Sequence, residues 1–212
     1  MFRVRGALAF ALALGAAYAA LAVLVATGAL NGPDQWSVDH LMPGLTGGSR
    51  GPSLVDAVVP LLDASWATGL DVVANVVTLP AQAVVASSLV GVCCLVLWRQ
   101  GRRRAALAWG GAWLYGNAVE VLCKSTLERP LLHAQDYALV AFQSSYPSGH
   151  TLRSVLLAAA VAAVWPAARG WAAAWAAASL VLLEVDGFHV PTDIVGGLLL
   201  ALLLIPAARS AG

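Results

Sequence analysis

The sequence predicts an all-α polytopic membrane protein in which six transmembrane helices form one bundle. Of its 212 residues, 60% are hydrophobic and only 11% are charged, whereas a soluble domain has about 25% charged residues. The mean hydropathy is +0.79. Long apolar runs alternate with short polar segments, and at roughly 20 residues a span the chain can cross a bilayer about six times. We therefore expect residues 1–212 to form a single membrane domain.

The composition also excludes several classes of protein. A disordered chain or an ordinary cytosolic protein would carry more charge. The net charge of +1 leaves no broad basic surface for a phosphate backbone, so no nucleic-acid partner is expected. The three cysteines, Cys93, Cys94 and Cys123, lie in apolar segments. They are typical of small buried hydrophobic residues rather than of a disulfide framework or a zinc site.

The first apolar run and the segment after it predict a span and an interfacial helix. Residues 6–30 are free of charge and exceed the roughly 7–15 apolar residues of a signal peptide, so we expect an uncleaved first span. In residues 31–70, Asp56 and Asp63 are seven residues apart, which places them on one helical face. A short amphipathic helix at residues 54–62, either on the membrane surface or packed on the bundle, is predicted.

The rest of the chain contains five further apolar segments of suitable length. Pro80 falls inside the first of them, where we expect a kink that the packing of a bundle tolerates. The expected spans after the first are residues 72–98, 105–123, 149–168, 171–188 and 192–208.

The basic residues give these spans a direction, because lysine and arginine remain in cytoplasmic segments. If the N-terminus is inside, eight of the twelve basic residues fall inside, namely Arg3, Arg5, Arg99, Arg102, Arg103, Arg104, Arg169 and Arg209. The four that fall outside are Arg50, Lys124, Arg129 and Arg153. All four histidines and most carboxylates fall outside as well, so a polar cluster is expected at the outer ends of the third to sixth spans.

A first candidate element is Tyr146-Pro147-Ser148-Gly149-His150, which precedes an apolar helix. Ser148 suits a helix N-cap, Gly149 allows a ligand close to the backbone, and a helix start binds phosphate. His150 is then placed to protonate a leaving group. An ordinary helix start with a surface histidine is the simpler alternative, and Ser148 as a nucleophile is a less natural one.

Two further elements fall at the same face. His189 precedes Asp193 by four residues, so the carboxylate can accept one ring N–H and leave the other nitrogen free to attack. Lys124 and Arg129 place two cations in one loop, which suits a phosphate group. The alternatives are an interfacial histidine with a capping aspartate and a snorkelling lysine that pairs with Glu120.

Together these elements predict a phosphoryl-transfer site that needs no metal and no other cofactor. A metal site formed by His150, His189, Asp193 and Glu184 is the competing chemical interpretation. It leaves Lys124 and the Pro-Ser-Gly element unexplained.

On these residues the chain resembles the integral-membrane type-2 phosphatidic acid phosphatases, which are related to haloperoxidases. Their motifs are K-x6-R-P, P-S-G-H and S-R-x5-H-x3-D, and the chain contains Pro147 to His150 and the pair His189 and Asp193. The resemblance covers essentially the whole chain and implies the six-span topology. It implies that His189 attacks phosphorus, that Asp193 orients it and that His150 is the general acid, while Lys124, Ser148 and Gly149 hold phosphate.

Two arginines of the family pattern are missing from this chain. Leu131 and Leu183 occupy the arginine positions, and Arg129-Pro130 comes two residues early, where some members carry a doubled R-P-R-P. We expect Arg153, assisted by Arg129, to reach the phosphate instead. The alternative is that Arg153 pairs with a carboxylate, for which Glu128, Glu184 and Asp186 are the candidates.

The expected function is hydrolysis of a lipid phosphate or pyrophosphate, with a polyprenyl or glycerolipid tail, through a phosphohistidine. A phosphotransferase that uses the same phosphohistidine and an inactive relative are the alternatives. We expect an integral protein of a bacterial inner membrane, with the site on the outer face and the bilayer and lipid substrate as partners. Gly196 and Gly197 suit close helix packing within one chain or between copies, so the sequence assigns no oligomeric state.

Overall fold

The computed structural model describes residues 2–42, 69–134 and 137–210 of the chain. These residues form eight α-helices and one two-stranded antiparallel hairpin. The helices are α1 (Phe2–Ala26), α2 (Asn31–Leu41), α4 (Gly69–Thr78), α5 (Ala83–Arg99), α6 (Arg103–Thr126), α7 (Gly149–Val164), α8 (Arg169–Val185) and α9 (Pro191–Ser210). The strands are β1 (His133–Ala134) and β2 (Tyr137–Ala138).

Helices lie at all six segments that the sequence predicts as spans, with bounds that differ by a few residues. The predicted kink at Pro80 is present as a short 3-10 turn, Leu79–Ala81, between α4 and α5. Proline has no N–H to donate and disfavours a helical residue before it. The axis accordingly bends by 45° between Val72–Ala81 and Ala83–Arg99.

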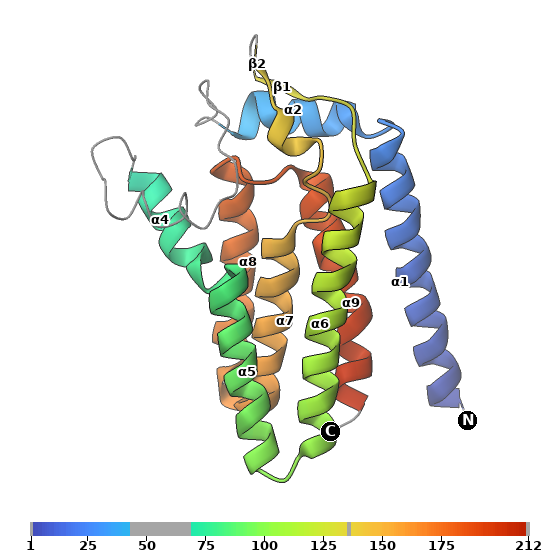
Figure 1. Ribbon diagram of the computed structural model, residues 1–212, viewed down its shortest axis with the longest axis vertical. Helices are drawn as coiled ribbons and strands as arrows, with labels where there is room; N and C mark the ends of the chain where they lie inside the picture. The colour runs from blue at the N-terminus through green and yellow to red at the C-terminus, as the bar shows by residue number, and fades with distance from the viewer. Residues whose placement is uncertain (1, 43–68, 135–136, 211–212) are drawn as a thin grey trace.

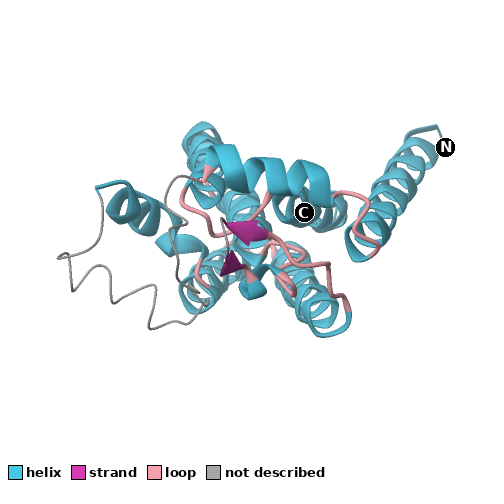
Figure 2. Cartoon of the chain, turned by 90° about the horizontal axis from the view of Figure 1, so that it is seen from above, coloured by secondary structure: helices cyan, strands magenta, loops and turns pink. Residues whose placement is uncertain are grey.

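The long helices run alternately up and down, which brings both chain ends to one end of the molecule (Figure 1). Helices α5, α6, α7 and α9 share one hydrophobic core that includes Trp109, Leu156 and Leu200. Helix α1 packs on α9 at the edge of the bundle, as the view from above shows (Figure 2). Helix α2 and the hairpin cover the end away from the termini.

Two of the described helices are long and apolar enough to cross a membrane, Leu8–Ala26 and Pro191–Ser210, and the bent α4–α5 pair makes a third if it counts as one span. Six crossings are thus not established. Helix α7 has 16 residues, and at 1.5 Å a residue it is about 24 Å long against a hydrocarbon core of about 30 Å. The outer surface still fits a membrane, because large apolar side chains such as Leu12 and Val23 are exposed.

Two elements in the described residues were not expected from the sequence. One is α2, in which Asp34 lies in the first turn, as is usual at a helix start. The other is the hairpin, whose strands have only two residues each and therefore leave no periodic pattern in the sequence. The amphipathic helix predicted at residues 54–62 lies outside the described residues.

Candidate functional site

The two predicted histidines lie side by side at the end of the bundle away from the chain termini. His150 is the second residue of α7, and His189 lies in the loop between α8 and α9. Their ring centroids are 6.1 Å apart, with the rings tilted by 57°. Phe188 lies close to His150 as well, with 6.3 Å between the ring centroids. The structure thus brings together two side chains that are 39 positions apart in the sequence, as the motif analysis predicts.

A glycine turn fixes the position of His189. Helix α8 is followed by Gly187, whose φ of 75° is in the left-handed region that favours glycine. The N–H of Gly187 donates to the carbonyl of Glu184 at 2.9 Å, and the N–H of Phe188 donates to that of Leu183, also at 2.9 Å. This is the Schellman pattern that ends a helix. It reverses the chain and holds His189 beside the start of α9.

Asp193 is fully buried and contacts His189 from the first turn of α9. Its Oδ2 atom lies 3.4 Å from Nδ1 of His189 and accepts the Ser145 hydroxyl at 2.6 Å. A carboxylate at Nδ1 favours the tautomer with the proton on that nitrogen, which leaves the lone pair on Nε2. The predicted orienting role of Asp193 agrees with this geometry.

The surroundings of His189 keep its ring uncharged. Burial lowers the pKa of His189 below its usual 6.5 and outweighs Asp193, which acts in the opposite direction. The positive charge of Lys124 adds to the lowering. An imidazole that is neutral at pH 7 is the form in which the ring can attack an electrophile.

Ser148 caps α7 instead of facing a ligand. Its side-chain oxygen accepts the N–H of Thr151 at 3.2 Å, and its own N–H donates to the backbone carbonyl of Asp193 at 2.9 Å. Ser148 is fully buried. The expectation that it holds phosphate therefore finds no support in its contacts. Its role is to join the start of α7 to the start of α9, which keeps His150 beside His189.

Protein side chains pack closely against the backbone at Gly149. A Cβ atom at this position would clash with the carboxylate of Glu120 and with the guanidinium of Arg153. The close packing of these two side chains is a reason for glycine here, and the predicted contact of Gly149 with phosphate stays a prediction. Any larger residue at this position would push them apart.

Glu120 of α6 joins the two cations nearest to the histidines. Its Oε1 accepts a hydrogen bond from Nζ of Lys124 at 2.7 Å, and its Oε2 accepts one from Nη1 of Arg153, also at 2.7 Å. Arg153 also donates to the carbonyl of Ala81 at 2.9 Å and to Asn117 at 3.2 Å. Arg153 therefore does pair with a carboxylate, as the alternative interpretation predicts. The partner is Glu120, however, and not Glu128, Glu184 or Asp186.

Of the two cations that pair with Glu120, Lys124 is the more exposed to solvent. Its side chain is 31% exposed, against 9% for Arg153. Both cations act electrostatically on the ring of His150. With one carboxylate between two cations, this cluster keeps a positive charge next to the histidines.

Arg129 lies on the far side of Asp193 from His189 and is almost fully buried. Nη1 of Arg129 donates to Oδ1 of Asp193 at 3.2 Å, whereas Oδ2 of Asp193 contacts His189. Nη2 of Arg129 donates to Asp34 and, at 3.0 Å, to the hydroxyl of Thr192. Two carboxylates pair with this guanidinium, which indicates a structural role behind Asp193. That Arg129 also binds phosphate stays a prediction.

Asp34 is the residue of this network that the sequence analysis missed. It is fully buried in the first turn of α2, and it accepts both the N–H of Thr192 at 3.1 Å and its hydroxyl at 2.6 Å. The helix-start pattern of Pro33-Asp34 was its only local signal. Its partner is 158 positions away, which no local pattern indicates.

The side chains proposed for the competing metal site do not gather as a ligand set. Among the described residues, no group of three or more His, Cys, Asp or Glu side chains is arranged to hold a metal ion. Glu184 accepts the hydroxyl of Ser37 at 2.9 Å and so fixes α2 to the end of α8.

Comparison of the chain with protein-family models, with curated proteins and with solved structures finds no match. The interpretation of the site therefore depends on its own geometry and on the short motifs.

Proposed function

We propose that the protein is a membrane lipid phosphatase of the type-2 phosphatidic acid phosphatase kind, which removes phosphate from a lipid phosphate or pyrophosphate. The observation that carries the proposal is the pairing of His189, held by Asp193, with His150 at 6.1 Å between ring centroids. Two imidazole rings this close belong to one site, so one ring can act on phosphorus while the other acts on the leaving oxygen of the same small group.

In the proposed reaction, Nε2 of His189 attacks phosphorus and the bond from phosphorus to the lipid oxygen breaks. His150 gives the leaving oxygen a proton. Water then attacks the phosphohistidine, with His150 taking a proton from it, and the phosphorus–nitrogen bond breaks to release phosphate and free His189. The start of α7, apart from the Thr151 N–H that Ser148 accepts, and the positive charge of Lys124 are available to the developing charge.

The proposal extends to the membrane. We propose that all six apolar segments cross or line the bilayer of a bacterial inner membrane, with the histidines at the outer leaflet. The support is the distribution of arginines, since the expected inside segments all carry at least one. A polyprenyl or glycerolipid tail would remain in the membrane while its headgroup reaches His189.

An inactive relative is the second candidate, and one observation favours it. Arg129 and Arg153, the arginines expected to replace the two missing ones, are both paired with buried carboxylates. A phosphoryl transition state spreads charge over its equatorial oxygens and is stabilised by cations at that place. A phosphotransferase remains an alternative of the same chemistry.

A phosphate-release assay with purified protein tests these functions together. The panel holds polyprenyl and glycerolipid mono- and diphosphates, each with and without a chelator. We expect release from at least one lipid, loss of release in His189→Ala, a loss of about 10²–10⁴-fold in His150→Ala, and no effect of the chelator. His133→Ala is the matched control, because His133 is an exposed histidine at the same end of the molecule.

Three results would contradict the proposal. Folded wild-type protein that releases no phosphate from any lipid indicates the inactive relative. Loss of release with chelator indicates a metal. Activity that survives in His189→Ala rules out the proposed nucleophile.

A further inference from the structure

The charges of the chain are divided between the two ends of the bundle. Among the described residues, the aspartates and glutamates belong to segments at the end away from the termini, whereas the segments at the end that holds both termini carry eight arginines and no aspartate or glutamate. Exposed Trp98, Trp165 and Trp171 belong to the same end, and tryptophan is enriched where a membrane meets water. This end is therefore positively charged at the depth of lipid headgroups.

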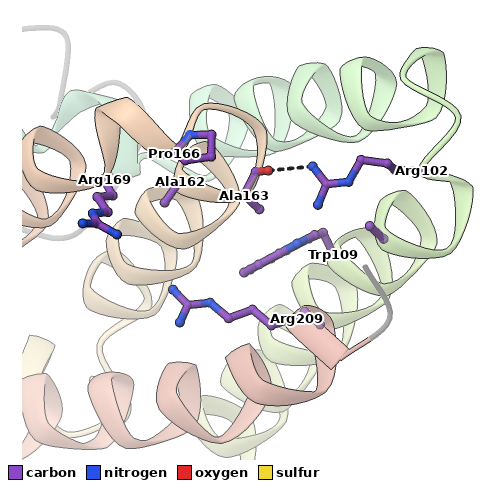
Figure 3. Close-up of a pocket in the computed structure, with 9 residues that line it drawn as sticks. Arg102, Trp109, Ala162, Ala163, Pro166, Arg169 and Arg209 are labelled. Carbon is purple, nitrogen blue, oxygen red and sulfur yellow. Dashed lines mark hydrogen bonds between the residues drawn. The ribbon is translucent and has the colours of Figure 1, made fainter.

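A cavity of about 330 Å³ opens in this positively charged end. Three arginines from different segments line it: Arg102 from the α5–α6 turn, Arg169 from the start of α8, and Arg209 from the last turn of α9. Figure 3 shows Arg102 and Arg209 on either side of the buried Trp109 ring, with Arg169 across the pocket. The fold thus brings three cations around one cavity. An excess of arginine at this end would not by itself gather three of them there.

Within the part of the chain that the structure describes, no aspartate or glutamate lines this arginine pocket. Arg102 donates to the carbonyl of Ala163 at 2.8 Å, which satisfies an oxygen at the end of α7 but neutralises no charge. The ion pairs of the described residues do not include any of the three arginines. Three like charges around one cavity repel each other, and an anion in the cavity would relieve that repulsion.

An apolar groove of about 390 Å³ begins at the same turn between α7 and α8. Ala162 and Ala163 line the arginine pocket, while Leu157 and Val161 on the neighbouring face of α7 line the groove, which runs along the side of the bundle. All twelve residues around the groove are apolar or aromatic. The two hollows share no lining residue, but the same turn contributes to both, with Pro166 in the pocket and Trp165 in the groove. A basic cavity and an apolar groove that start from one turn match a molecule with an anionic head and a hydrocarbon tail.

We propose that this end of the protein binds an anionic phospholipid, with its phosphate headgroup in the arginine pocket and an acyl chain in the groove. The site is at the opposite end of the bundle from His150 and His189, and it does not depend on the proposed catalytic function. Basic pockets between membrane helices are a recognised setting for anionic headgroups.

Thermal unfolding of the full-length protein, delipidated in detergent, tests this site. We expect phosphatidylglycerol to raise the Tm, and phosphatidylcholine or soluble glycerol 3-phosphate at the same concentration to leave it unchanged. The double variant Arg169→Gln/Arg209→Gln should weaken the apparent binding of phosphatidylglycerol by about 30-fold, because each arginine near an anionic lipid contributes about a factor of five. Arg99→Gln/Arg104→Gln is the matched control, since it removes the same charge from the same end outside the pocket.

The outcomes separate the site from general electrostatic attraction. Equal weakening in both double variants would show that only the overall positive potential attracts the lipid, and it would overturn the proposal. An equal rise of the Tm with glycerol 3-phosphate would show a soluble-anion site without a lipid. If the Arg169→Gln/Arg209→Gln protein does not fold, Arg209→Gln alone replaces it, because no described hydrogen bond involves the side chain of the exposed Arg209. The expected weakening is then about fivefold.

Discussion

Replacing Arg129 by methionine tests whether this arginine has a structural role or binds phosphate. The substitution keeps an unbranched side chain but leaves Asp34 and Asp193 without their shared cation. Both carboxylates are fully buried, and the guanidinium side chain is only 1% exposed. Breaking a buried ion pair by removing one partner costs about 3–5 kcal/mol. At about 2–4 °C per kcal/mol for a chain of this size, we expect the Tm to fall by roughly 6–20 °C.

The assay is thermal unfolding in detergent, followed by circular dichroism, with phosphate release measured in parallel. Arg129→Met/Asp34→Asn should recover part of the loss, because one of the two unpaired charges is gone while the asparagine can still contact Thr192. Arg99→Met is the control, since an exposed arginine away from such networks changes stability by about 0.5 kcal/mol or less. The difference between the double variant and the sum of the single ones measures the coupling of the pair.

One result would refute this reasoning. If Arg129→Met keeps the wild-type Tm and raises the KM for lipid phosphate, then Arg129 contacts the substrate and not the two carboxylates. A lower Tm in Arg129→Met that Arg129→Met/Asp34→Asn does not recover at all would show that Asp34 is not its partner.

Three further predictions concern the residues around the histidines. Asp193→Asn should lower kcat by up to about 10⁴-fold, yet less than His189→Ala does, because the nucleophile remains; equal losses in the release assay would contradict an orienting role. Since burial lowers the pKa of His189 below 6.5, the loss of kcat/KM that follows protonation of this nucleophile should be centred below pH 6.5, and a loss on acidification centred above 6.5 in the pH profile would contradict this. Arg153→Ala should lower the stability by less than the about 3–5 kcal/mol of a buried charge left with no partner, because Lys124 still pairs with Glu120, and Arg153→Ala/Glu120→Gln should restore part of the Tm. A wild-type Tm with a tenfold lower kcat/KM would instead support a phosphate-binding Arg153.

Local patterns were enough to locate the helices of the six apolar segments and the pair of histidines, although they missed α2. An apolar run of about 20 residues favours a helix wherever it occurs, and Pro80 disturbs a helix through its own ring and missing N–H. The four-residue spacing from His189 to Asp193 places both side chains on the same side of a helix start, so their contact follows from the sequence. Such features depend on neighbours within a few residues, and this is the range over which a sequence can be interpreted directly.

The partners of the charged side chains were decided only by the tertiary structure. Arg129 pairs with Asp34 across 95 positions, and Arg153 pairs with Glu120 across 33. A buried charge must find an opposite charge wherever the packing of helices places one, and the motifs contain no information on that packing. The sequence by itself determined the helices of the six apolar segments and the predicted roles of His150 and His189; the tertiary structure decided which cations are neutralised by carboxylates.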